Sequence, residues 1–216
     1  MEVFRVDIEK IKTNLENRIP SIMGAQRFTK YAVLLPLIKV DDEIHLLLEV
    51  RALSLRRQPG EICFPGGKMD KGDKNEQYTA IRETSEELGI PNECISIVAP
   101  LDYTISPFGT IIYPFVGYIS ELNLNPNPSE VDKVFTVPLS HFISNPPDCF
   151  KVHFKAVPEE GFPYELIRGG QKYKWQTRHM EEYFYYYEDY VIWGLTAGII
   201  KQFVELIKNE TPLNNE

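Results

Sequence analysis

Residues 75–88 form the segment that most constrains how this chain can fold, because helix signals stand at both of its ends. Asp73, followed three residues later by Glu76, resembles a capping box, in which a side chain binds a free backbone amide of the first turn. Gly89 and Pro91 mark the other end, since neither residue readily continues a helix. The sequence therefore predicts one helix here.

Three glutamates share one face of this predicted helix. Glu83, Glu86 and Glu87 are spaced i, i+3 and i+4, which brings their side chains together. Like charges at this spacing destabilise an isolated helix, whereas a divalent cation such as Mg²⁺ prefers carboxylate oxygens and removes the repulsion. Ile81 and Leu88, seven residues apart, provide an apolar stripe that holds the helix on a core. The pattern indicates a metal site.

A solvated acidic surface is the simpler explanation, and for the glutamates alone it would be favoured. The segment before the helix changes this balance. Residues 64–67 read Phe-Pro-Gly-Gly, and glycine is the residue that most readily takes a positive φ in a sharp turn. Such a turn brings the backbone close to whatever the carboxylates bind, which a merely solvated helix does not need.

The rest of the chain predicts a mixed sheet with a few helices in a single domain covering residues 1–216. Strands are expected at residues 32–38, 44–50, 61–64, 95–103, 110–119, 131–137, 150–157 and 183–187. Pro36 suggests an edge strand or a bulge, because proline lacks the ladder donor. Helices are expected at residues 4–16, within an N-terminal extension (1–28), and at 189–206, followed by a frayed tail at 209–216.

Composition excludes several classes of protein. The 216 residues carry a formal net charge of −8, the opposite of what a general nucleic-acid binder needs, so no nucleic-acid partner is expected. Three cysteines, Cys63, Cys94 and Cys149, show neither a disulfide framework nor zinc-ligand spacing. No apolar run approaches the roughly 20 residues of a membrane span. We expect a reduced, cytoplasmic protein without a membrane partner.

Residues 67–90 resemble the Nudix box. Its usual form is Gly, five residues, Glu, seven residues, Arg-Glu, an aliphatic residue, any residue, Glu-Glu, any residue, Gly and an aliphatic residue. The second half is matched at Arg82, Glu83, Glu86, Glu87, Gly89 and Ile90. Thr84 departs from the aliphatic position. Asp73 replaces the first Glu and is one residue too far from Arg82, so it either caps the helix or pairs with Arg82, and the cap is slightly favoured.

The resemblance implies the Nudix α/β/α sandwich, a mixed sheet between helices. It also implies that Glu83, Glu86 and Glu87 ligate Mg²⁺ or Mn²⁺, with Glu86, Glu87 and Arg82 as the catalytic residues. Arg82 would orient Glu86 by a charge-assisted bond. The general base stays open between these glutamates and a carboxylate outside the box such as Glu130.

Residues 47–67 look like the signature of the coenzyme A pyrophosphatase subgroup. The matching positions are Leu47, Leu48, Arg51, Ala52, Arg56, Gly60 and the Phe-Pro-Gly-Gly turn of residues 64–67, whereas Glu49 stands where Thr is usual. The substrate-binding residues so implied are Arg51, Arg56, Arg57, Gly66, Gly67 and Lys68. The cations suit a substrate with a diphosphate and a 3'-phosphate, since Arg binds phosphate with a planar fork. Their simpler role is to pair with surface acids.

The function predicted from these residues is metal-dependent hydrolysis of coenzyme A or its derivatives to 4'-phosphopantetheine and adenosine 3',5'-bisphosphate. One alternative is another diphosphate substrate, such as ADP-ribose. A second alternative is a Nudix-fold module that binds a ligand without catalysis. The aromatic residues 183–187 and the last helix are candidates for a homodimer contact.

Overall fold

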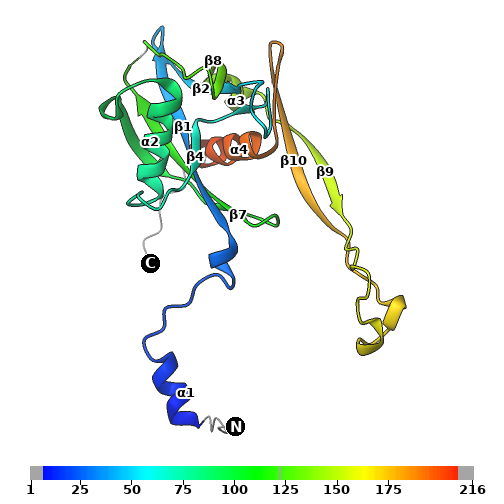
Figure 1. The fold of residues 1–216 in the computed structure, drawn as a ribbon. Helices are drawn as coiled ribbons and strands as arrows, with labels where there is room; N and C mark the ends of the chain where they lie inside the picture. Colours follow the sequence, from blue (N-terminus) through cyan, green and yellow to red (C-terminus); the bar gives the residue numbers. More distant parts are fainter. Residues whose placement is uncertain (1–6, 122, 209–216) are drawn as a thin grey trace.

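The computed structural model describes residues 7–121 and 123–208, which form one 8-stranded sheet, a smaller sheet and helices (Figure 1). The large sheet has the order β3-β2-β1-β7-β5, with β4 on β1, β6 on β7 and β8 on β2. Its strands are β1 (Thr29–Val40), β2 (Glu43–Arg51), β3 (Ile62–Cys63), β4 (Gly66–Lys68), β5 (Ile95–Pro100), β6 (Thr104–Ser106), β7 (Thr110–Ile119) and β8 (Val131–Pro138). β1 and β7 are parallel and the other pairs antiparallel, so the predicted mixed sheet is confirmed.

Helices cover both faces of this sheet. On one face α2 (Glu76–Leu88) packs its Ala80 and Leu88 against Leu34 of β1, while on the other face α4 (Gly194–Lys208) packs Ile200 near Leu35. Neighbouring residues of a strand point to opposite faces, so the apolar run in β1 serves both layers. α3 (Leu139–Ser144) lies on the α4 side (Figure 1). The expected α/β/α sandwich is confirmed.

Pro36 lies inside the sheet, so the expectation of an edge strand or bulge is wrong. β1 pairs with β7 along one side, and on its other side it changes partners from β4, last paired at Val33, to β2, first paired at Leu37. The Leu34 amide donates to the Pro65 carbonyl at 2.9 Å, toward that second side. The backbone nitrogen of Pro36, two residues after Leu34, points to this same side of β1. It therefore lies between the part of β1 that pairs with β4 and the part that pairs with β2, where no ladder donor is needed.

A second sheet consists of β9 (Asp148–Phe154), β10 (Arg178–Tyr187) and β11 (Tyr190–Trp193). In Figure 1, β9 and β10 form a long hairpin that reaches away from the large sheet, toward the short helices η3 (Tyr164–Leu166) and η4 (Gly170–Lys172). β10 is longer than the predicted strand at 183–187. Tyr185 is 2% exposed and packs in the core with α4, whereas the neighbouring Tyr186 is 51% exposed.

The last helix begins at Gly194 and not at residue 189, which corrects the sequence prediction. Tyr190–Trp193 is aromatic and β-branched, and it pairs with β10 as β11. Gly194 then takes a φ of 64°, which separates the strand from the helix. Ile199 and Phe203 of this helix are buried, whereas Leu195 and Leu206 are exposed.

The N-terminal helix α1 (Ile8–Leu15) begins after Asp7, whose carboxylate accepts a bond from the Lys10 amide at 2.9 Å. None of its residues is buried, and Figure 1 shows it away from the sheets. η1 (Ala25–Arg27) and η2 (Asn92–Cys94) are short 3₁₀ helices. The start of the predicted helix at residues 4–6 and the predicted frayed tail at 209–216 lie outside the described residues. No helix within 7–121 and 123–208 combines the length and apolar character of a membrane span.

Candidate active site

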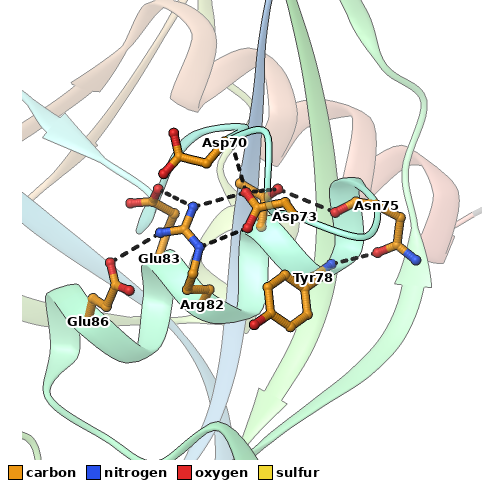
Figure 2. Close-up of polar contacts among 8 residues, drawn as sticks. Asp70, Asp73, Asn75, Tyr78, Arg82, Glu83 and Glu86 are labelled. Carbon is orange, nitrogen blue, oxygen red and sulfur yellow. Dashed lines mark hydrogen bonds and ion pairs between the residues drawn. The ribbon is translucent and has the colours of Figure 1, made fainter.

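α2 begins at a cap that the sequence analysis did not identify. The side chain of Asn75 accepts a hydrogen bond from the Tyr78 amide at 2.8 Å, while Asn75 itself has an extended backbone (Figure 2). At the other end Gly89 takes a φ of 63° and its amide bonds to the Ser85 carbonyl. The boundaries agree with the predicted helix, but Asp73 is not its cap, because Asp73 lies two residues before Asn75.

Asp73 instead anchors Arg82. The guanidinium Nε donates to Oδ1 and Nη2 to Oδ2 of Asp73, both at 3.0 Å, as Figure 2 shows. The same Oδ2 accepts bonds from the Thr79 hydroxyl and the Asp70 amide. The Arg82 guanidinium is the main reason that the pKa of Asp73 lies well below its usual range. Of the two roles left open by the sequence, the pair with Arg82 is the one observed.

The rest of the Arg82 guanidinium faces the box glutamates. Nη2 donates to Glu83 Oε1 at 2.8 Å and Nη1 to Glu86 Oε2 at 3.2 Å (Figure 2). The expected contact between Arg82 and Glu86 is therefore present. The Glu86 side chain is 56% exposed, whereas that of Glu83 is 19% exposed. Arg82 thus joins the loop before α2 to two of the three glutamates.

Replacing Asp73 tests this anchor against the cap. We expect D73N to lower the melting temperature at pH 7 by more than N75A, for which loss of a cap costs about 1 kcal/mol. The folded pKa of Asp73 is depressed, so its contribution is present above the ordinary value of 3.8 and is lost as pH falls below it. The gap between wild type and D73N should begin to narrow as the pH falls below 3.8, while that for N75A should not. Equal effects of the two variants at all pH values would contradict the anchor.

Two glycines let the carboxylates approach the backbone. The Gly66 amide donates to Glu87 Oε2 at 2.7 Å. A Cβ on Gly67 would lie 2.3 Å from the carboxylate carbon of Glu83, so only glycine leaves room for that group. Burial, followed by the charge of Glu49, raises the pKa of Glu87 to about 9. Burial also raises the pKa of Glu83. The predicted turn at residues 64–67 therefore lies beside the glutamates.

Glu49 is a site residue that the sequence analysis noted only as a departure from the subgroup signature. It shares with Leu47 the face of β2 that looks toward α2, and it is fully buried. Burial is the largest cause that raises its pKa to about 7, and Glu130 adds to this. The Cys63 thiol, whose own pKa is raised by burial, donates to Glu49 Oε1 at 3.3 Å. A charged residue within the apolar run 46–50 was the signal available in the sequence.

Glu130, proposed as a base outside the box, lies at the same site. Asn127 donates to its Oε2 at 2.9 Å, and its charge raises the pKa of Glu49, Glu83 and Glu87. Its backbone carbonyl accepts a bond from the Ala52 amide at 2.8 Å, which ties it to the end of β2. The structure therefore keeps Glu130 among the candidates for a base.

The predicted phosphate-binding cations are at different places. Arg51 at the end of β2 lies near Glu49, and its charge lowers the pKa of that carboxyl. Lys68 ends β4 directly after Gly67. Arg56 and Arg57 are exposed on the loop between β2 and β3, with no hydrogen bond to the carboxylates of α2 in the described chain. No salt bridge between described residues engages any of these four cations, so the surface-pairing role is not observed there.

A pocket of about 560 Å³ lies elsewhere, beside β3 and the β10–β11 turn. Tyr190, which stacks on Phe135 with ring centroids 3.8 Å apart, lines it, together with Lys133 and Trp193. None of the box glutamates lines this pocket. It is therefore not the place where metal chemistry would occur.

The glutamates fit a divalent cation in their chemistry, although they are not positioned as a finished site. Among the described residues, no three His, Cys, Asp or Glu side chains stand as a ready set of metal ligands. Glu83 is bound to Arg82 and Glu87 to the Gly66 amide. Glu49 and Glu83 nevertheless raise the pKa of Glu87, and the charge of Glu130 raises the pKa of all three. A cation offsets this repulsion. Ligation would require the glutamates to exchange their present partners for the ion.

Comparison with known proteins agrees with this geometry. Residues 29–159 match the model of the NUDIX domain, which is more than half of the chain. The chain belongs to the Nudix family. Members of this family hydrolyse diphosphate compounds and generally use divalent ions such as Mg²⁺ or Mn²⁺.

Individual relatives add detail. An uncharacterized Nudix hydrolase NudL of Photorhabdus laumondii is 36% identical over 82% of this chain and 84% of its own. The peroxisomal coenzyme A diphosphatase NUDT7 of Mus musculus is 37% identical over 53% of this chain, but the match spans only 49% of the mouse protein. Nudix hydrolase 3 of Caenorhabditis elegans is 31% identical over 95% of this chain and 84% of its own. A solved structure of a C. elegans Ap4A hydrolase binary complex, 23% identical, covers 54% of this chain and 84% of its own with a TM-score of 0.44.

Proposed function

We propose that this protein hydrolyses the diphosphate bond of coenzyme A or its derivatives and releases 4'-phosphopantetheine and adenosine 3',5'-bisphosphate. The observation that carries the proposal is the run of residues 47–67, in which the subgroup signature leads directly into the turn that contacts Glu87. The 37% identity to the mouse coenzyme A diphosphatase supports it.

The residues divide into two groups in this reaction. Glu83, Glu86 and Glu87 would hold Mg²⁺ or Mn²⁺, and the bound ion would neutralise the diphosphate and activate a water. Arg82 holds Glu83 and Glu86 in place from its anchor on Asp73. The second group consists of the cations Arg51, Arg56, Arg57 and Lys68, which are proposed to bind the phosphates together with the backbone of Gly66 and Gly67. A base chosen from Glu130 and the box glutamates would take the proton of the water.

The proposal predicts a substrate order. Coenzyme A, dephospho-coenzyme A and ADP-ribose are incubated with the protein and Mg²⁺, Mn²⁺ or a chelator, and the products are separated. We expect metal-dependent release of adenosine 3',5'-bisphosphate from coenzyme A, with weaker turnover of the other two. R56Q should raise KM for coenzyme A about tenfold, the loss of roughly 1.4 kcal/mol of binding, and should affect dephospho-coenzyme A less.

The matched control is R168Q, an exposed arginine in the distant segment between β9 and β10, which should leave KM unchanged. Preferred hydrolysis of ADP-ribose by the wild-type protein would overturn the substrate proposal and leave the metal-binding roles standing. The homodimer and the cytoplasmic location stay predictions, to be tested by sedimentation velocity and by cell fractionation.

A further inference from the structure

Glu49 is a buried carboxylate with one of its two oxygens unpaired in the described chain. Its relative exposure is 0%, and Oε1 accepts the bond from Cys63, but Oε2 has no partner among the described residues. Burying an unpaired carboxylate costs several kcal/mol, about the largest penalty that a single polar group imposes on a fold. A cation bound at Oε2 would offset this cost.

Arg51 is a cation whose charge acts on Glu49. Arg51 follows two residues later on the same face of β2, yet no salt bridge joins it to Glu49, and the buried Arg51 Nε also has no partner in the described chain. A negative and a positive group thus lie side by side with unused atoms. This is the pattern expected of a site that holds a cation and an anion together.

The surroundings of Glu49 are acidic. Its charge is the second-largest cause of the raised pKa of Glu87, after burial, and Glu130 acts on both carboxyls. Glu49 also lies on the face of β2 from which Leu47 packs in one cluster with Ala80 and Leu88, so it faces the helix that carries the box glutamates. A threonine at this position, as the subgroup signature has it, would supply no charge.

We propose that Glu49 is an additional ligand of the divalent metal, binding it from β2 while the box glutamates bind it from α2. Arg51, next to Glu49 on the same face of β2, would bind a phosphate oxygen of the diphosphate. The inference rests on the metal-dependent hydrolysis proposed above. Hard cations such as Mg²⁺ and Mn²⁺ bind more tightly as carboxylate ligands are added. Glu49 would therefore increase either the number of ions bound or their affinity.

Metal binding without substrate tests the proposal. Mn²⁺ is titrated into wild-type protein, E49Q and E49D, and the free ion is followed by electron paramagnetic resonance. We expect E49Q to bind one ion fewer, or the same number at least tenfold more weakly, and E49D, which keeps the charge on a shorter side chain, to lie between E49Q and wild type. The matched control is E43Q, which makes the same change at an exposed position of β2 and should bind as wild type.

Thermal melting separates a ligand from a structural hydrogen-bond acceptor. With chelator, E49Q should melt at the same temperature as wild type or higher, because it removes a repelled buried charge, and the rise on adding Mn²⁺ should be smaller than in wild type. If Glu49 serves only Cys63, E49Q should melt lower and bind Mn²⁺ within twofold of wild type, which would overturn the proposal. If E49Q does not fold, unchanged Mn²⁺ binding by E49D would overturn it equally.

These readouts are independent of the substrate proposal. Loss of Mn²⁺ affinity in E49Q together with no cleavage of coenzyme A by wild type would retain the metal role and reject the substrate. Cleavage of coenzyme A by wild type together with unchanged Mn²⁺ binding in E49Q would retain the substrate proposal and reject the metal role of Glu49.

Discussion

Glu87→Gln should lower kcat for metal-dependent diphosphate hydrolysis about a thousandfold, which corresponds to roughly 4 kcal/mol of transition-state stabilisation. Glu87 is 5% exposed and points from α2 toward the Gly66 amide, so it is the box glutamate most enclosed by the protein. Gln preserves the shape and can still accept the bond from Gly66, but it lacks the charge that a divalent cation needs. Product release from coenzyme A with Mg²⁺ is the measurement.

The same substitution should not destabilise the metal-free protein. The pKa of Glu87 in the folded protein is raised to about 9, whereas its ordinary value is 4.5. Between these pH values the Glu87 side chain is ionised in the unfolded state but stays protonated in the folded state. The metal-free wild type therefore loses stability across this window as pH rises, and E87Q lacks the part of this loss that Glu87 causes. We expect the melting temperature of E87Q to exceed that of wild type increasingly from pH 6 to pH 9, in the presence of a chelator.

Glu93→Gln is the matched control, because Glu93 is exposed in η2 just beyond α2. It should retain the kcat and the pH profile of wild type. Turnover by E87Q within a few fold of wild type would remove Glu87 from the metal site. A large fall in its melting temperature at pH 8 would instead show that Glu87 acts structurally.

The sequence was sufficient for those features that depend on local patterns. The C-terminal end of helix α2 follows from Gly89, and the predicted contact between Arg82 and Glu86 is an i, i+4 pair on that helix. The turn at Gly66 and Gly67 was anticipated because few other residues can approach a neighbouring backbone so closely. In each case a short stretch of chain contains the whole cause.

The errors concern contacts between distant segments. Asp73 is a residue type common at helix caps. Only the folded loop shows that its carboxylate binds Arg82, nine positions later. Pro36 indicates an edge locally, yet β4 and β2 divide one side of β1 between them and leave its missing donor unneeded. Thr84 departs from the family pattern and is fully buried, with its hydroxyl unpartnered among the described residues, and nothing in the structure explains that choice.

Glu49 shows why the site could not be completed from the sequence. A glutamate inside a strand of alternating faces points either to solvent or to the core, and the strand itself does not reveal which helix covers it. Only the packing of α2 on the face of the sheet that includes Leu47 shows that Glu49 faces the helix carrying Glu87. The sequence identified the helix that carries the proposed metal ligands but not the strand that faces it.

Alanine at the two adjacent glycines of β4 should separate stability from activity. A Cβ on Gly66 would lie 2.4 Å from the Ala32 carbonyl oxygen and 2.6 Å from the Val33 Cα, both backbone atoms of the central strand that cannot move aside. Gly66 also has a φ of 148°, which side chains rarely adopt. We expect G66A to lose about 3 kcal/mol of folding free energy or more, a fall in melting temperature of roughly 6–12 °C for a chain of this size.

Gly67→Ala meets a different neighbour. Its Cβ would lie 2.3 Å from the carboxylate of Glu83, which is the flexible end of a side chain and can swing away at little cost to the fold. We expect G67A to melt within a few degrees of wild type and yet to lose kcat about a hundredfold, since a displaced ligand or catalytic group typically costs on that order. If G67A is fully active, Glu83 does not need its present place against the backbone. If G67A is as unstable as G66A, both glycines are needed for folding, and Gly67 does not serve only to make room for the Glu83 carboxylate.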